Sequence, residues 1–516
     1  MNQEALHRVP SIQPLCEFLG KDPADFHKAD LVRYCAAKQI RRLILRYIAL
    51  DGRIRELICP ISDENYLYKL LAFGERVDGS SLFPGLFAHT SSDLYVVPVY
   101  ETAFQDPFDP AALSVICRFF GKDGLPARET PEEALRSAFE RLKAATGFEL
   151  WAMGEMEYYL ILDKKDDRFT GLTQRNYHQS SPFSHGGAIL RDVIDKLSAI
   201  SGAVKYGHGE VGYLDCIESQ DPELDGKRVE QQEVELLPRP APAAAVLTTL
   251  ATWTIRNCAN LAGASATFAP KLDPRLAGSG MHLHLALVRN GINVMDDGAG
   301  GLSDVAVKMI GGLLKHADLL VALGNTVASS FLRLGSGMET PMSVCWSAYN
   351  REAMIRVPLG WQGAESMEHA ANPFEPLPAP MSEPRQTVEL RSPDASAFTF
   401  LLLTAICRAA EDGLTGPDST ALAMKLRVTP DGNPGTRNDS GLPKLPTCCA
   451  DGAAALSKNR SFLEDGGVVC PALIDHAVRK LESERDRELP EELSRLPRKQ
   501  RELLTRRIMH KDLHKH

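Results

Sequence analysis

Three strand-like stretches of this sequence each place two polar or charged side chains two positions apart. The stretches are GEMEYYLIL (154–162), GMHLHLAL (280–287) and VELRSPD (388–394), with the pairs Glu155 and Glu157, His282 and His284, and Glu389 and Arg391. Residues i and i+2 of a strand share one face. A single pair of this kind is usually a solvent-facing strand face, but three pairs among apolar neighbours favour a sheet that lines one polar cavity.

Composition limits the class of protein to which such a sheet can belong. The chain has 516 residues, 44% hydrophobic and 24% charged, which is ordinary for a globular protein of two or more domains. The net charge of −9 disfavours general nucleic-acid binding. We find no apolar run long enough for a membrane span and no secretory signal. The 11 scattered cysteines indicate free thiols, so we expect a cytoplasmic protein.

Turn and capping signals divide the chain into elements. Residues 1–40 have helical spacing, residues 41–61 predict a hairpin around Asp51-Gly52, and Thr130 caps a predicted helix over 129–146. The turn-rich stretch 120–128 predicts a boundary between domains 1–127 and 128–516. Residues 360–384 predict an exposed loop, and charged helices follow from residue 471. The pattern as a whole predicts an α+β fold with a mainly antiparallel sheet.

The residue types in the predicted cavity indicate metal and phosphate chemistry. Carboxylates with one imidazole suit magnesium or manganese, which prefer hard oxygen ligands. Arginines near these acids suit phosphate or carboxylate groups through planar, bidentate hydrogen bonds. Together, metal-binding carboxylates and arginines are the residue types that phosphoryl-transfer enzymes use. The sequence has no GxxxxGK[ST] loop, so a nucleotide must be held in another way.

Nine short motifs follow one another in a fixed order along the chain. They are DGSS (78–81), SSDLYVVP (91–98), GEMEYYL (154–160), HGEVG (208–212), EQQEVE (230–235), ATFAPK (266–271), GSGMHLH (278–284), NREAMIRVP (350–358) and VELRSPDASA (388–397). In this order they resemble the glutamine synthetases of the bacterial type, from about residue 30 to about residue 465.

The resemblance implies a fold and an assembly. It implies a helical lead and a small β-grasp domain within residues 1–127. It also implies a catalytic ATP- and metal-binding domain (128–516) with a curved antiparallel sheet flanked by helices and a charged helical tail. Members of the family form homo-oligomeric rings, so we expect a dodecamer or decamer whose active sites are shared between neighbouring subunits.

The resemblance also implies two metal sites for Mg²⁺ or Mn²⁺ and a set of substrate-binding residues. The ion nearest the acid substrate would be held by Glu157, Glu210 and Glu233. The ion between the phosphates of ATP would be held by Glu155, His282 and Glu389. The residues implied to act on the substrates are His284 beside the nucleotide, Arg351 and Arg356 on the phosphates, Arg333 and Arg391 on the acid's carboxylates, and the flap residue Glu339, which would shield the acyl phosphate and take a proton.

The interval between Glu210 and Glu233 is longer than in the family, which makes Glu218 a rival third ligand. The spacing from Glu233 to His282 agrees with the family, and EQQE resembles its GQNE. We therefore assign the ligand to Glu233 and treat residues 212–229 as an insertion.

Two positions depart from the family pattern. Ala49 stands where the family has an aspartate that binds and deprotonates ammonium, and Ala277 stands where it has an asparagine that contacts glutamate. An alanine can neither attract a cation nor take its proton. The pattern therefore resembles ligases that join glutamate, or a related acid, to an organic amine. The alternatives are a true glutamine synthetase that uses ammonia and a non-catalytic, ring-forming regulatory homologue.

Overall fold

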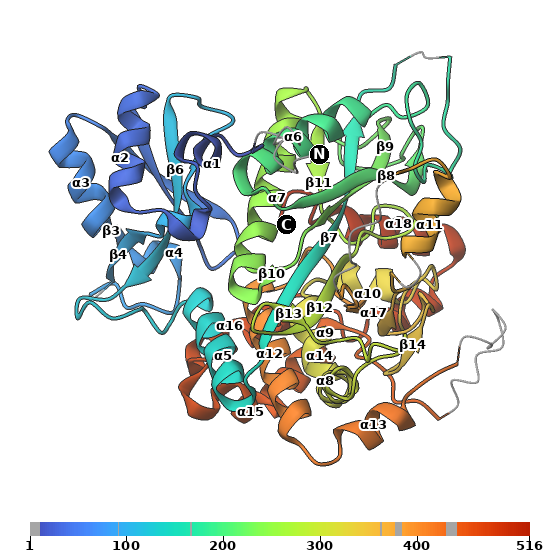
Figure 1. The fold of residues 1–516 in the computed structure, drawn as a ribbon. Helices are drawn as coiled ribbons and strands as arrows, with labels where there is room; N and C mark the ends of the chain where they lie inside the picture. The colour runs from blue at the N-terminus through green and yellow to red at the C-terminus, as the bar shows by residue number, and fades with distance from the viewer. Residues whose placement is uncertain are drawn as a thin grey trace.

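A computed structural model of the chain describes residues 11–90, 92–165, 168–361, 364–376, 384–429 and 441–515. Two sheets organise the described residues, a six-stranded sheet near the N-terminus and a ten-stranded sheet that carries the polar cavity. Figure 1 shows the N-terminal part to one side of the larger sheet, with α7 (Ala241–Leu261) between them. The predicted α+β class is confirmed.

The N-terminal sheet has the order β2-β1-β6-β4-β3, with β5 paired to β6. Strands β1 and β6 are parallel and the other pairs are antiparallel. The predicted hairpin is confirmed, because Ile48 of β1 pairs with Ile54 of β2 across the Asp51-Gly52 turn. The elements of this region are α1 (Pro14–Leu19), α2 (Lys28–Ala37), β1 (Arg42–Ile48), β2 (Ile54–Pro60), α3 (Glu64–Phe73), β3 (Glu75–Asp78), α4 (Gly79–Leu82), β4 (Asp93–Pro98), β5 (Phe104–Gln105) and β6 (Ala112–Phe120).

The large sheet has the order β14-β15-β16-β12-β7-β9-β8, and the short strands β10 and β11 pair with β7 and β13 pairs with β12. All of its pairs are antiparallel except β14 with β15. Its strands are β7 (Glu149–Leu162), β8 (Val204–Leu214), β9 (Arg228–Leu236), β10 (Arg239–Pro240), β11 (Ser265–Thr267), β12 (Met281–Arg289), β13 (Ile292–Asn293), β14 (Trp346–Ala348), β15 (Ile355–Val357) and β16 (Val388–Leu390).

Helices cover the apolar face of this sheet, and α7 contacts β7 directly. The predicted helix over 129–146 is confirmed as α5 (Pro131–Thr146), where the Thr130 side chain accepts a hydrogen bond from the Glu133 amide. The remaining helices are α6 (Gly187–Ser201), α8 (Asp304–Lys315), α9 (Ala317–Gly324), α10 (Ala328–Leu334), α11 (Ala364–Ala371), α12 (Thr399–Thr415), α13 (Ser419–Lys425), α14 (Cys449–Lys458), α15 (Arg460–Glu464), α16 (Pro471–Glu482), α17 (Leu489–Arg495) and α18 (Arg498–His510).

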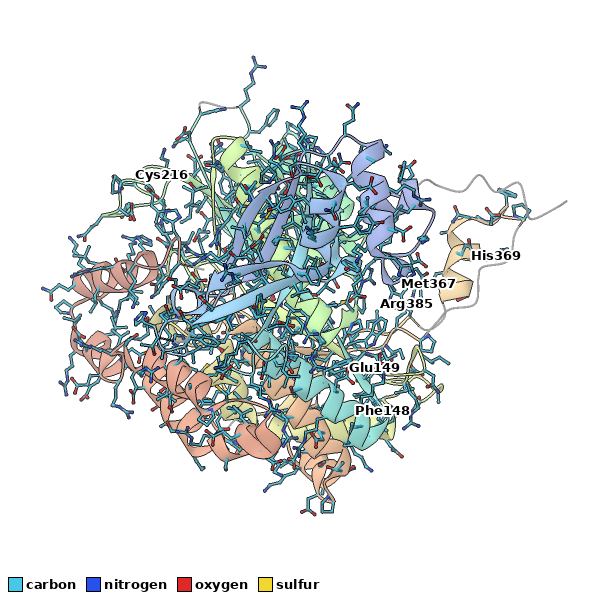
Figure 2. The ribbon with its side chains drawn as sticks, turned by 90° about the vertical axis from the view of Figure 1, so that its left-hand side faces the viewer. Phe148, Glu149, Cys216, Met367, His369 and Arg385 are labelled. Carbon is cyan, nitrogen blue, oxygen red and sulfur yellow. The ribbon has the colours of Figure 1, made fainter. Side chains whose placement is uncertain are left out.

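The prediction of a loop over residues 360–384 is wrong for α11, which stands out from the body of the molecule with Met367 and His369 on it (Figure 2). The Pro- and Gly-rich composition of the whole stretch concealed a short run of good helix formers. The predicted helices before residue 41 are confirmed as α1 and α2, while residues 1–10 lie outside the described part. No described helix is long and apolar enough to span a bilayer.

Candidate active site

A cavity of about 1390 Å³ opens on the polar face of the large sheet. The residues predicted to act in the site converge on it from β7, β8, β9, β12, β15, helix α10 and three loops. The predicted residues that line it are Glu155, Glu157, Glu210, Glu233, His282, His284, Arg333, Glu339, Arg351, Arg356 and Arg391. The twelfth, Glu389, is fully buried beside the cavity.

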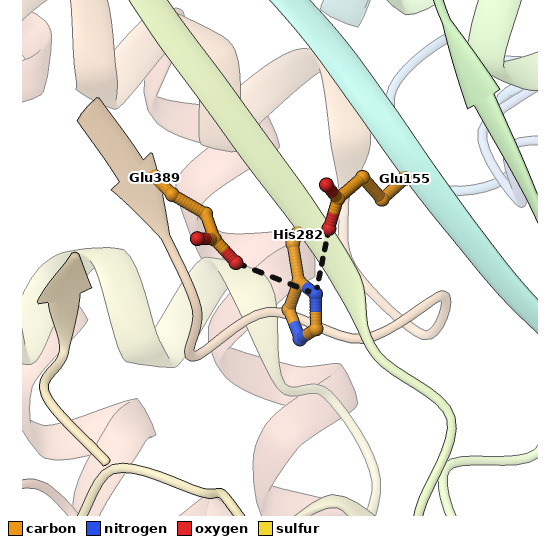
Figure 3. Close-up of side chains that lie close together, drawn as sticks. All are labelled: Glu155, His282 and Glu389. Carbon is orange, nitrogen blue, oxygen red and sulfur yellow. Dashed lines mark hydrogen bonds and ion pairs between the residues drawn. The ribbon is translucent and has the colours of Figure 1, made fainter. Parts of the chain in front are cut away.

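Glu155, His282 and Glu389 form a compact group at the base of the cavity (Figure 3). Strand pairing brings them together, because His282 lies opposite Glu155 in the β12–β7 register. His282 Nδ1 lies 3.1 Å from Glu155 Oε2 and 3.7 Å from Glu389 Oε1. Two carboxylates with one imidazole at this spacing could hold a divalent cation.

Glu389 is fully buried between two guanidinium groups. Arg356 Nη1 donates to its Oε2 at 2.7 Å, and Arg391 Nη1 donates to its Oε1. Burial would raise the pKa of Glu389, but Arg391 and the imidazoles of His284 and His282 hold it below its ordinary value. The carboxylate therefore stays ionised despite its burial.

A second acidic group surrounds Glu210. His208 Nε2 lies 3.2 Å from Glu233 Oε1, and the same imidazole lies 3.8 Å from Glu210 Oε2. Burial, followed by the nearby carboxylates of Glu157 and Glu233, raises the pKa of Glu210 to about 8. Clustered carboxylates that cannot all ionise are a donor set that fits a divalent cation, whose charge relieves their repulsion.

Glu157 is fixed by the chain that precedes β12. Its Oε2 accepts hydrogen bonds from the Gly280 amide at 2.8 Å and from Gln231 Nε2 at 3.2 Å. Its Oε1 lies 3.7 Å from His282 Nδ1, so Glu157 stands between the two acidic groups. The predicted division of six ligands into two sets of three stays a prediction, because these contacts link the two sets.

His284 lies at the inner end of the cavity and is enclosed by protein. Its Nε2 is 2.8 Å from Glu155 Oε1, and its Nδ1 is 2.9 Å from Thr387 Oγ1. Burial would raise the pKa of Glu155, but His284 and His282 together hold it well below its ordinary value. The predicted role of His284 beside a nucleotide stays a prediction.

The remaining predicted residues stand nearer the mouth. Arg351 Nη1 lies 3.4 Å from Glu339 Oε2, and both side chains are about half exposed or more. Glu339 has a positive φ of 55°, a conformation that non-glycine residues adopt only when their surroundings enforce it. Arg391 Nε donates to the Arg351 carbonyl oxygen at 2.8 Å, which couples the base of the site to this loop.

The glycines before β12 let the backbone approach Arg333. A Cβ on Gly278 would lie 2.5 Å from both the Pro270 carbonyl oxygen and Arg333 Cγ. Arg333 is itself held by Nη1, which donates to the Ser392 carbonyl oxygen at 2.8 Å. The GSGMH stretch therefore combines a steric requirement for glycine with a metal-ligand candidate.

Sequence reasoning did not include Gln231, Glu235 or Lys205, and it left His208 undecided between a site role and a structural one. His208 and Gln231 lie two positions before Glu210 and Glu233 on β8 and β9, so the i, i+2 rule could have found both. Glu235 groups with Glu155 and His284, and Lys205 Nζ lies 2.6 Å from its Oε1.

Glu218, the rival ligand, lies outside the cavity. Its Oε2 accepts a hydrogen bond from Arg506 Nη1 of α18 at 3.0 Å. Arg506 Nε is 3.3 Å from Asp273, in the loop that leads to Ala277. The insertion therefore contacts the C-terminal helix α18, and α18 in turn contacts the loop that leads into β12.

Known proteins share both this fold and this sequence pattern. The family model for the glutamine synthetase catalytic domain matches residues 128–495. The chain is 29% identical over 401 residues to the glutamine synthetase of Thermus thermophilus, covering 75% of this chain and 80% of that protein. It is 28% identical over 377 residues to the glutamine synthetase of Pyrococcus horikoshii, covering 73% and 75%.

Two solved structures have the same fold. Apo GmaS without ligand has a TM-score of 0.69 at 21% identity and covers 92% of this chain and 98% of its own. The cryoEM glutamine synthetase of Plasmodium falciparum has a TM-score of 0.69 at 18% identity, with the same coverage. The predicted family fold is confirmed, and the match over residues 128–495 shows that the chain belongs to the glutamine synthetase family of ligases.

Proposed function

We propose that this chain is an ATP-dependent ligase that joins the γ-carboxylate of glutamate to an organic amine. The observation that carries the proposal is Ala49, which is buried just after β1. Asp51 does not replace the missing carboxylate, because its Oδ2 lies 2.6 Å from Arg55 Nη2 and its Oδ1 accepts from the Arg53 amide. Without a free carboxylate at the hairpin, ammonium loses its attraction and its base, while a larger amine gains apolar contact.

Ala277 is the second departure from the glutamine synthetase pattern, and it also supports a change of substrate. It lines the active-site cavity with a methyl group, and its carbonyl oxygen accepts a hydrogen bond from Tyr159 Oη at 2.8 Å. Position 277 itself supplies no side-chain amide to orient an acid substrate. Arg333 and Arg391 are then the groups that would hold the acid, and the acid could differ from glutamate in its α-substituents.

The reaction would proceed in two transfers. A carboxylate oxygen of the acid attacks the γ-phosphorus of ATP, which gives an acyl phosphate and ADP. The amine nitrogen then attacks the acyl carbon, and phosphate leaves as the amide forms. Divalent cations bound by the two acidic groups would neutralise phosphate charge, while Arg351 and Arg356 would orient the phosphates. Glu339, at the mouth of the cavity, would exclude water and take the proton released by the amine.

The position of Ala49 also supports a ring. Ala49 lines a second cavity rather than the active-site cavity of its own chain. To contact an amine it would have to reach the site of a neighbouring copy. We therefore include in the proposal a ring of twelve or ten subunits with shared active sites.

Phosphate release from ATP tests the proposal directly. The purified protein would be assayed with glutamate and Mg²⁺ or Mn²⁺, and with ammonia, alkylamines, diamines and aromatic amines in turn. We expect kcat/KM for at least one amine to exceed that for ammonia by about tenfold or more. Ala49→Asp should shift this preference towards ammonia. Efficient turnover with ammonia and with no organic amine would contradict the proposal.

The main alternative is a true glutamine synthetase, which is favoured by the names of the relatives from Thermus and Pyrococcus. A non-catalytic ring is the second alternative. The buried carboxylates of the site argue against it, because uncompensated buried charge is costly and a scaffold has no chemical use for it. ATP turnover that depends on a divalent metal would exclude it.

A further inference from the structure

A second cavity, of about 820 Å³, lies on the opposite face of the catalytic sheet. Met156 and Met281 line it, and they alternate along β7 and β12 with Glu155, Glu157 and His282 of the active site. Successive side chains of a strand point to opposite faces. One layer of sheet therefore separates the two cavities.

The walls of the second cavity carry an excess of positive charge. They come from the β1–β2 hairpin, α7, the start of α12, α16 and the last residues of the chain, and their permanently charged groups are Arg53, Arg55, Arg256, Lys480, Lys515, Asp51 and Glu132. Both acids already have arginine partners. Asp51 pairs with Arg55 of the same lining at 2.6 Å, and Glu132 pairs with Arg118 at 2.8 Å. Lys480 and Lys515 in turn pair with Glu484, at 3.6 Å and 3.5 Å, so the unpaired positive charge of the lining comes from its other arginines.

Two arginines of this cavity have no carboxylate partner. Within the described ranges, neither Arg53 nor Arg256 lies within 4.0 Å of an acidic oxygen. Arg256 Nη2 is buried without a hydrogen-bond partner in that same part of the chain. Burial, and then the charge of Arg53, lowers the pKa of Arg256 to about 10. Arg53 lines the same cavity, and its Nη2 donates to the His514 carbonyl oxygen. Such an arrangement is costly unless an anion joins the two guanidinium groups.

The first turn of α12 adds to the positive potential of the second cavity. Thr399, Phe400 and Leu401 line the cavity at the N-terminus of a 17-residue helix. The N-cap residue Phe398 supplies no side-chain hydrogen bond to the free amides of that turn. Helix N-termini favour anions through these amides and the helix dipole.

We propose that the second cavity binds a small molecule bearing a carboxylate or phosphate group, held between the guanidinium groups of Arg53 and Arg256. The planar guanidinium matches either oxyanion through two parallel hydrogen bonds. The volume leaves room for an organic body beyond the anionic group. Because Arg53 belongs to the hairpin that carries Ala49, an occupant would tie this hairpin to α7 behind the catalytic sheet. This anion site is an addition to the proposed reaction, although it shares the β1–β2 hairpin with Ala49, and its test needs no turnover.

Calorimetric titration of the full-length protein, with succinate in one arm and inorganic phosphate in the other, tests the site. We expect saturable binding of at least one probe, and the preferred probe distinguishes a carboxylate from a phosphate ligand. Arg256→Gln and Arg53→Gln should each weaken that binding by about tenfold or more, the usual value of a charged hydrogen bond. Arg53 is exposed, so its variant keeps the test valid if Arg256→Gln fails to fold.

Two control variants locate the bound anion. Arg479→Gln removes an exposed cation of α16 that does not line the cavity, and it should bind the probe like the unmodified protein. Arg356→Gln alters the active-site cavity and should leave the binding in place. Loss of binding in Arg356→Gln alone, unchanged binding in the Arg53 and Arg256 variants, or the absence of saturable binding would each overturn the proposal.

Discussion

At the residue scale, the protonation of Glu210 makes metal binding depend on pH. The folded site raises the pKa of this carboxyl from 4.5 to about 8, so the group is largely protonated at neutral pH. A divalent cation requires the ionised form and must displace that proton. We expect Mn²⁺ affinity to rise by about tenfold per pH unit below this pKa and to level off above it.

Titrations of Mn²⁺ between pH 6 and 9 would measure this dependence, together with the number of protons released. Glu210→Gln should weaken metal binding and flatten the pH profile. Glu218→Gln is the matched control, because this carboxylate belongs to the insertion and pairs with Arg506 instead. An affinity that does not change with pH, or a loss of binding in Glu218→Gln, would contradict the assignment.

At the scale of elements, the C-terminal helix α18 braces the loop that enters β12. His510 Nε2 lies 2.7 Å from the Leu272 carbonyl oxygen, and Thr267 Oγ1 donates to the Leu513 carbonyl oxygen at 2.6 Å. Leu513 packs in a small core with Leu272 and Leu276. The loop then continues to Ala277 and Gly278 in the active-site cavity. The tail, which extends beyond the family match at residue 495, thus supports the loop that carries Ala277 and Gly278 into the cavity.

Arg506→Gln should therefore raise the KM for the acid severalfold with a smaller change in kcat. It should also lower the free energy of unfolding by about 1–3 kcal/mol, because Asp273 loses a charged partner. Steady-state kinetics and denaturant unfolding measure the two effects. Arg507→Gln, at the exposed neighbouring position, should change neither. Equal effects of the two variants would show that α18 does not act through Asp273.

At the scale of the whole molecule, the proposed ring makes assembly a condition for activity. Mass photometry should give a particle of ten or twelve copies of the 56.6 kDa chain. Dilution or mild denaturant that dissociates the particle should abolish turnover while the individual chains keep their secondary structure. A fully active monomer would contradict shared active sites.

Local patterns predicted the parts of the fold that depend on local physics. The alternation in GEMEYYLIL and GMHLHLAL predicts β7 and β12 with their polar faces, since the strand period is set by the backbone alone. The Asp51-Gly52 turn and the Thr130 cap predict the hairpin and α5 for the same reason. The error at α11 came from averaging composition over a long stretch that contains a short helix-forming run.

The sequence by itself therefore determined which residues could face the cavity, and the order of its motifs indicated the family. Only the tertiary structure decided how those residues meet: that β7 pairs with both β12 and β9, that Arg356 and Arg391 enclose Glu389, and that Arg506 reaches Asp273. These contacts join positions far apart in the chain. Strand order and register set them, and the local periodicity of a sequence does not encode which strands become neighbours.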